Sequence, residues 1–121
     1  MYGKEVILDL HNCNTNLFSR SCIGNFFDKL CTFLGMEQCD VHFWDYSGEQ
    51  EEYDKAPDHL KGISAIQFIT TSNITIHTLD VLKQVHINVF SCAEFNSDSV
   101  KEFCEEWWQG EVVNYTVTGR V

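Results

Sequence analysis

Four side chains that can attack a carbonyl carbon or move a proton occur within one stretch of the sequence. They are the hydroxyls of Ser64 and Ser72, the imidazole of His77 and the thiol of Cys92. A hydroxyl or thiol becomes a nucleophile once a base removes its proton, and histidine is the commonest such base near neutral pH. The stretch therefore carries the parts of a nucleophilic site, and the surrounding elements must bring those parts together.

The residues around these four alternate between apolar and polar types. Ile74 and Ile76, for example, alternate with Thr75 and His77. This period of two is typical of strands that are buried on one face only. The stretch from 62 to 92 is therefore predicted to form three short strands.

For Ser72 and His77 to meet, the strand that carries them must be interrupted. They lie five residues apart, so a single continuous strand would put their side chains on opposite faces. We expect a turn or bulge near Ser72, because the next residue, Asn73, is of a type that favours turns.

The rest of the chain supplies the elements that would hold these strands. Further strands are expected at 5–10, 39–46 and 111–118, and helices at 21–34 and 97–108. Ser19 or Ser21 can cap the start of the first helix, and Asn96 or Ser97 that of the second. Gly35 and Gly110 can end these helices. Residues 47–59 carry five acidic side chains and the only proline, which is typical of a solvated insertion. This order predicts a single α+β domain, 1–121, built as a two-layer sandwich with a mainly antiparallel sheet and two helices packed on one face.

The composition and charge exclude several classes of protein. Of the 121 residues, 44% are hydrophobic, which is enough for a globular core, while the apolar runs are too short to cross a membrane. Eighteen acidic residues against eight basic ones give a net charge of −10, which argues against nucleic acid because phosphate binding needs clustered Lys and Arg. No secretory signal pattern is present at the start, so we expect a cytoplasmic protein with no membrane partner.

The six cysteines could belong to disulfides or to a metal site. No Cys-x-x-Cys pair occurs, and Cys22 and Cys31 lie in a helical pattern among Phe and Leu residues. In a reducing compartment we therefore expect most of them to be small buried hydrophobic residues, with no bound metal.

Each of the four reactive residues also has a purely structural explanation. Serines in turns commonly bond the backbone, a single histidine on a strand is commonly structural, and Cys92 could pack like the other cysteines. A Ser/His/acid hydrolase fits poorly, because the sequence has no Gly-x-Ser-x-Gly elbow.

Three segments resemble the processing and catalytic segments of the small prokaryotic S-adenosylmethionine decarboxylases, which are pyruvoyl enzymes made as proenzymes. The segments are Gly62-Ile-Ser, Ser72-Asn-Ile-Thr-Ile-His-Thr and Asn88-Val-Phe-Ser-Cys. The intervals between the four reactive residues, of eight, five and fifteen positions, also agree with that family. The opening Gly3-Lys-Glu-Val-Ile-Leu-Asp-Leu-His-Asn-Cys resembles the family's first strand and turn, so the resemblance covers most of the chain.

The resemblance implies a chain that cleaves itself between Thr71 and Ser72. The hydroxyl of Ser72 would attack the carbonyl of Thr71, and β-elimination would leave a covalent pyruvoyl group in place of the serine. His77 would accept a proton and Ser64 would support this processing, as their counterparts do in the family. The ketone would form a Schiff base with the substrate amine, and Cys92 would return a proton after CO2 leaves.

The sequence departs from the family pattern close to the expected substrate. Thr71 replaces the usual Glu, Asn73 replaces the usual His, and Leu79-Asp-Val replaces the usual Trp-Pro-Glu. The residues implied in processing, Ser64, Ser72 and His77, are therefore kept, while the positions that recognise the nucleoside in the family are altered. Substrate contacts are expected from Thr71, Asp80, Phe43 and Trp44.

The expected ligand is a small cationic substrate of the amino-acid type. The resemblance favours S-adenosylmethionine and a place in polyamine biosynthesis, and the departures leave arginine or ornithine as alternatives. A further alternative is an unprocessed, non-catalytic relative that acts as a binding or regulatory protein.

A single sheet with helices on one side leaves its other face bare for a partner. Six aromatic residues are candidates for an apolar surface there: Phe43, Trp44, Phe68, Phe90, Trp107 and Trp108. We expect a homodimer, and the resemblance implies that the active sites lie at the junction between the two protomers.

Overall fold

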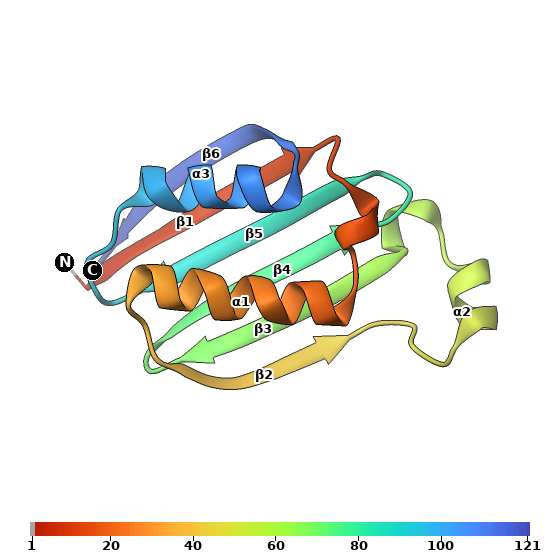
Figure 1. Ribbon diagram of the computed structural model, residues 1–121, viewed down its shortest axis with the longest axis horizontal. Coiled ribbons are helices and arrows are strands. Elements are labelled where there is room, and N and C mark those ends of the chain that lie inside the picture. The colour runs from red at the N-terminus through yellow and green to blue at the C-terminus, as the bar shows by residue number, and fades with distance from the viewer. Residues whose placement is uncertain (1) are drawn as a thin grey trace.

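The computed structural model describes residues 2–121, which form one six-stranded antiparallel sheet and its helices (Figure 1). The strands are β1 (Gly3–His11), β2 (Gln38–Trp44), β3 (Gly62–Ile69), β4 (Ser72–Leu79), β5 (Gln84–Ser91) and β6 (Glu111–Arg120), in the spatial order β2-β3-β4-β5-β1-β6. Helix α1 (Arg20–Leu34) packs beside β2 and β3, and α3 (Ser97–Trp108) packs beside β1 and β6. Both helices cover the same face, so the predicted two-layer α+β sandwich is confirmed.

Local capping explains where the two helices begin and end. The side chain of Ser19 accepts a hydrogen bond from the backbone N–H of Cys22 at the start of α1, and Gly35 ends that helix in the left-handed conformation at φ 67°. Asn96 caps α3 in the same way. The expected stop at Gly110 is wrong by one residue, because Gln109 takes the left-handed conformation at φ 52°.

Gly110 is required for packing instead. A Cβ atom on this residue would lie 2.5 Å from the sulfur of Cys13 and 3.0 Å from the carbonyl oxygen of His11. The first contact is closer than real Cβ atoms show, and the second is tighter than nearly all of them. The chain therefore passes from α3 into β6 directly against the loop that follows β1.

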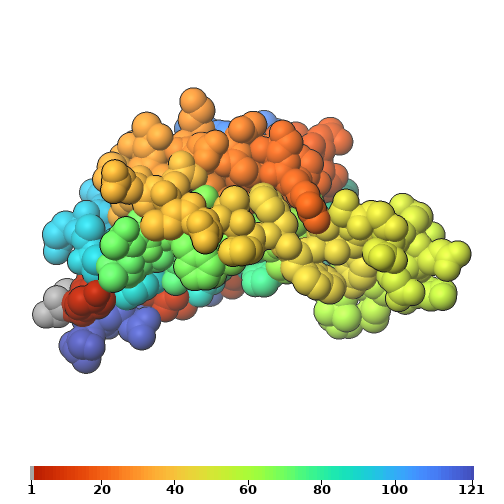
Figure 2. Space-filling model, turned by 90° about the horizontal axis from the view of Figure 1, so that it is seen from below, coloured from red at the N-terminus to blue at the C-terminus, as the bar shows by residue number. Residues whose placement is uncertain are grey.

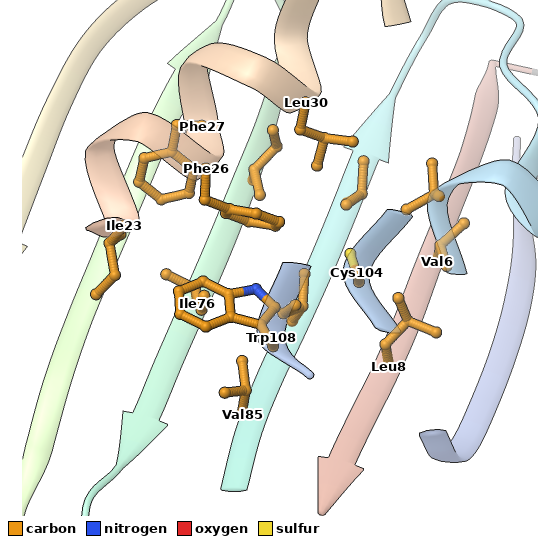
Figure 3. Packing of buried hydrophobic residues seen from close by; sticks show 14 of the residues in the cluster. Val6, Leu8, Ile23, Phe26, Phe27, Leu30, Ile76, Val85, Cys104 and Trp108 are labelled. Carbon is orange, nitrogen blue, oxygen red and sulfur yellow. The ribbon is translucent and has the colours of Figure 1, made fainter. Parts of the chain in front are cut away.

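The core lies between the helices and the covered face of the sheet (Figure 3). Alternate strand residues point into it, including Val6, Leu8, Ile74, Ile76, Val85 and Ile87. Phe26 of α1 and Trp108 of α3 meet above them with their ring centroids 5.2 Å apart. The two helices are thereby joined to each other as well as to the sheet.

The core also corrects the expected position of two aromatic residues. Trp108 is completely buried, and Trp107 packs against the edge of the core, so neither belongs to the bare face of the sheet. Val100, Cys104 and Trp108 are all buried in α3, and the spacing of four residues puts them on one side of the helix. Trp108 therefore lies on the side of α3 that faces the core.

The opposite face of the sheet, here called the open face, is left uncovered by α1 and α3. Its residues on the four inner strands are Glu5, Ile7, Asp9, Ser64, Ile66, Phe68, Asn73, Thr75, His77, His86, Asn88 and Phe90. On the two outer strands, His42 and Trp44 of β2 and Asn114, Thr116 and Thr118 of β6 continue the same face. These side chains are half-buried or exposed, whereas their neighbours along the strands are mostly buried beneath the helices. The open face is therefore a mixed polar and aromatic surface with room for a partner.

The acidic stretch forms a projection at one end of the molecule (Figure 2). It contains a short helix, α2 (Gln50–Lys55), and a 3-10 turn, η2 (Asp58–Leu60); another 3-10 turn, η1 (Thr15–Leu17), precedes α1. The hydroxyl of Tyr53 donates a 2.7 Å hydrogen bond to Asp80 at the end of β4, and this bond ties α2 to the sheet. Among residues 2–121 there is no helix with the length and apolar character needed to cross a membrane.

Candidate active site

The turn between β3 and β4 holds the bond expected to be cleaved. Ile69 pairs with Ser72, so Thr70 and Thr71 alone form the turn. Thr71 has a φ of 54°, in the left-handed region that a β-branched residue rarely occupies. The residue that precedes Ser72 therefore carries backbone strain.

This turn lies one residue earlier than expected. The interruption predicted near Ser72 and Asn73 is absent, because β4 runs regularly from Ser72 to Leu79 in register with both β3 and β5. As a result, Ser72 points to the covered face and His77 points to the open face.

Ser72 lies in a small cluster of hydroxyl and thiol groups. Its side chain is buried, and its Oγ donates a 3.3 Å hydrogen bond to Ser91 Oγ. The backbone N–H of Cys92 donates to Ser72 Oγ, also at 3.3 Å. The nucleophile expected from the sequence is therefore held by β5, beside the backbone carbonyl of Thr71.

The thiol of Cys92 belongs to the same cluster but is exposed. Its Sγ lies 3.0 Å from Thr71 Oγ1 and 3.9 Å from Ser72 Oγ. Hydrogen bonds with Thr71 and then Ser72 lower the pKa of Cys92 below its ordinary value of 9.0. Gly3 permits this arrangement, because a Cβ atom there would strike the carbonyl oxygen of Ser91.

Ser64 and His77 form a separate pair on the open face. They are directly opposite each other on β3 and β4, and Ser64 Oγ lies 2.8 Å from His77 Nδ1. Desolvation of the ring by surrounding protein, and then the charge of His86, lower the pKa of His77 from its ordinary value of 6.5. The pair is thus suited to passing a proton from a hydroxyl to a neutral imidazole.

The four reactive residues fall into two groups within one chain. His77 is five residues beyond Ser72 along the extended β4, a span of about 16 Å. Thr71, Ser72 and Cys92 gather at one end of the sheet, and Ser64 and His77 lie toward the end that carries α2. A single protomer does not bring the expected nucleophile, Ser72, and the expected base, His77, together.

A cavity of about 430 Å³ borders the Ser64–His77 pair. Its wall includes Trp44, which is 63% exposed, together with Tyr46, His59, Leu60 and Leu79. The cavity combines a proton-transfer pair with an apolar wall.

The other expected substrate contacts are placed differently. Phe43 is opposite Ala65 on the covered face and lies under the guanidinium of Arg20, 5.7 Å from ring centroid to carbon. Asp80 accepts the hydroxyl of Tyr53, and this bond, with burial, raises the pKa of that tyrosine to about 12. The carboxylate of Asp80 is thus already engaged by the chain itself.

Sequence reasoning did not find a second histidine site beside His77. His86 Nδ1 lies 2.7 Å from Asp9 Oδ1, and Asn114 donates a 3.0 Å hydrogen bond to the other oxygen of Asp9. Burial acts to raise the pKa of Asp9, but hydrogen bonds from Asn114 and His86 and nearby positive charge lower it overall. Asp9 and His86 both occupy polar positions in strands where apolar and polar residues alternate. This alternation is the feature of the sequence that could have indicated the pair.

Within residues 2–121, no group of three or more His, Cys, Asp or Glu side chains is arranged to hold a metal ion.

Comparisons with known proteins identify the family of the chain. A search of curated proteins finds no significant match. The family model described as S-adenosylmethionine decarboxylase matches residues 4–121. This match extends over nearly the whole fold and both reactive groups, so the chain belongs to the S-adenosylmethionine decarboxylase family.

Proposed function

We propose that the chain is a self-processing, pyruvoyl-dependent decarboxylase that acts on S-adenosylmethionine in polyamine biosynthesis. The observation that carries this proposal is the turn at Thr71, where a strained residue precedes a buried serine hydroxyl. Cleavage of the Thr71–Ser72 bond would release the turn, because the two strands would no longer be joined there.

The processing reaction uses atoms of the chain itself. Ser72 Oγ attacks the carbonyl carbon of Thr71, the peptide C–N bond breaks, and the freed amine takes up the hydroxyl proton. A base then removes the Cα proton of residue 72, the Cβ–Oγ bond breaks, and Thr71 leaves as a carboxylate. The dehydroalanine that remains takes up water and releases ammonia, which leaves the pyruvoyl group.

The base for this reaction comes, in our proposal, from a second copy of the chain. Ser64 and His77 are too far from Ser72 to act within one protomer. Both of these residues lie on the open face, where Phe68 is 43% exposed and available for contact with a partner. A homodimer that buries the open face can bring the Ser64–His77 pair of one protomer to the Thr71–Ser72 bond of the other.

The residues around position 72 fit the proposed prosthetic group. A pyruvoyl group at this position supplies a ketone that reacts with a substrate amine and accepts the electron pair left by CO2. Cys92 is exposed beside this position, and its lowered pKa makes its proton easier to transfer. We therefore assign Cys92 as the donor that protonates the α-carbon.

The side chains near the cavity favour S-adenosylmethionine over a diamino acid. Asp45 is bound by Arg20 through two hydrogen bonds of 2.6 and 2.7 Å, and Asp80 is bound by Tyr53. These two carboxylates are therefore not free to meet a second positive charge. The exposed indole of Trp44 offers a flat apolar surface that suits a purine ring.

Release of labelled CO2 tests the reaction and its substrate. The purified protein is incubated separately with carboxyl-labelled S-adenosylmethionine, arginine and ornithine, and the Ser72→Ala variant is the control. We expect CO2 from S-adenosylmethionine alone, and none from the variant. Release from arginine or ornithine would overturn the substrate, and no release from any of the three would favour the non-catalytic binding protein.

A further inference from the structure

His86 is held on the open face by acceptors at both ring nitrogens. Its Nδ1 lies 2.7 Å from a carboxylate oxygen of Asp9, and its Nε2 lies 3.1 Å from the amide oxygen of Gln84. A neutral imidazole has only one N–H and can satisfy only one such acceptor. In the imidazolium form, His86 donates from both nitrogens, to Asp9 and to Gln84.

The strand register places His86 beside His77, the expected proton acceptor of the site. His86 on β5 is directly opposite His77 on β4, and both side chains point to the open face. Side chains that face each other in this way have Cβ atoms about 5 Å apart. A positive charge on His86 therefore opposes a second positive charge on His77.

The Ser64 hydrogen bond depends on which form His77 takes. A neutral His77 ring with its proton on Nε2 accepts the Ser64 hydroxyl at Nδ1, over the observed 2.8 Å. A protonated ring would carry a hydrogen on Nδ1 and could no longer accept a proton there. Only the neutral form works as a base.

We propose that His86 is a positioning residue for the self-cleavage step: fixed by Asp9, it keeps the facing His77 in the neutral form that accepts a proton. This inference rests on the proposed function, because it concerns the same processing reaction. His86 itself has no contact with the bond that is cleaved, and it acts through His77.

Other ionisable groups surround His77 and His86, and the test must distinguish their effects from that of His86. Asp9 and His11 belong to β1, and the charge of His11 also acts on Asp9. His59 lines the same cavity as His77 and His86. The lowered pKa of His77 agrees with the proposal, since burial and the charge of His86 both contribute to it.

Titration of His77 by NMR tests the inference without any need for activity. All variants are made in a Ser72→Ala background, in which no cleavage can occur. We expect His86→Gln to move the His77 titration to higher pH, while His86→Lys keeps it low because the ammonium preserves the charge. His42→Gln is the matched control: His42 also lies on the open face and borders a second cavity with His77, but its strand partner is Ile66 and not His77. An unchanged His77 titration in His86→Gln, or an equal shift in His42→Gln, would overturn the inference.

The rate of cleavage provides the second measurement. In the chain that retains Ser72, the acid limb of the pH–rate profile is expected to move to higher pH in His86→Gln and to remain in place in His86→Lys. If the unmodified chain never cleaves, the proposed function fails while the titration still reports on His86. If the chain cleaves and the titration does not move, only the role of His86 fails.

Discussion

Ser72 and His77 leave opposite faces of the same strand, five residues apart on β4. The serine is buried beside β5, and the histidine meets Ser64 on the open face. A nucleophile and a base that cannot meet in one protomer require two copies of the chain, if they work together. Under the proposed function, the homodimer is therefore part of the chemistry.

Two inactive variants should therefore complement each other. Neither Ser72→Ala nor His77→Gln is expected to cleave alone, the first for lack of the nucleophile and the second for lack of the base. When the two chains are co-expressed with different tags, we expect the His77→Gln chain to be cut, because the partner supplies His77. Mass spectrometry of each tagged chain measures this. Normal cleavage of His77→Gln on its own would contradict the shared site.

Thr71→Gly tests the strain at the turn. In a Ser72→Ala background, removing the side chain from a left-handed residue is expected to raise the free energy of unfolding by about 0.5–1 kcal/mol. In the chain with Ser72, the same change is expected to slow cleavage, because less strain is released. Urea unfolding and a time course of intact mass measure the two effects.

The control for that experiment is Lys83→Gly in the β4–β5 turn. Lys83 has a φ of 55°, almost the same as the 54° of Thr71, but it is far from the cleaved bond. We expect a similar gain in stability with no change in the cleavage rate. Cleavage of Thr71→Gly as fast as that of the unmodified chain would show that strain makes no contribution.

Cys92 should ionise more readily than an ordinary thiol. Hydrogen bonds with Thr71 and Ser72 lower its pKa from 9.0, so the pH dependence of alkylation should have a midpoint below that value. Thr71→Val keeps the shape of the side chain and removes the hydroxyl, and it is expected to move the midpoint upward. A His77→Gln, Cys39→Ser background prevents cleavage and removes the other exposed thiol. A midpoint that Thr71→Val leaves in place would argue against this account of Cys92.

The elements of the fold could be predicted because local patterns specify them. Ser19 and Gly35 bracket a helix with a period of three to four, and alternation through Ile74 and Ile76 identifies a strand. In this helix and this strand, the sequence signals agree with the observed caps and with the observed burial. The sandwich followed from the order of such segments.

The details of the site could not be predicted, because they depend on partners distant in sequence. The turn at Thr71 has no Gly or Asn to mark it, while Asn73, which has the composition of a turn, lies inside β4. His86 and Asp9 are 77 positions apart and meet only through the β1–β5 register. Single-strand periodicity gives no information on which strands become neighbours.

The intact mass of the denatured, freshly purified protein tests the central claim most directly. Self-processing predicts two chains, one that ends at Thr71 and one that begins with a pyruvoyl group at position 72. The second chain should also gain the mass of a hydrazine label, because its new ketone is reactive. A single uncleaved chain after long incubation would contradict the account, and Thr71, in place of the family's usual Glu, would then be the first residue to exchange.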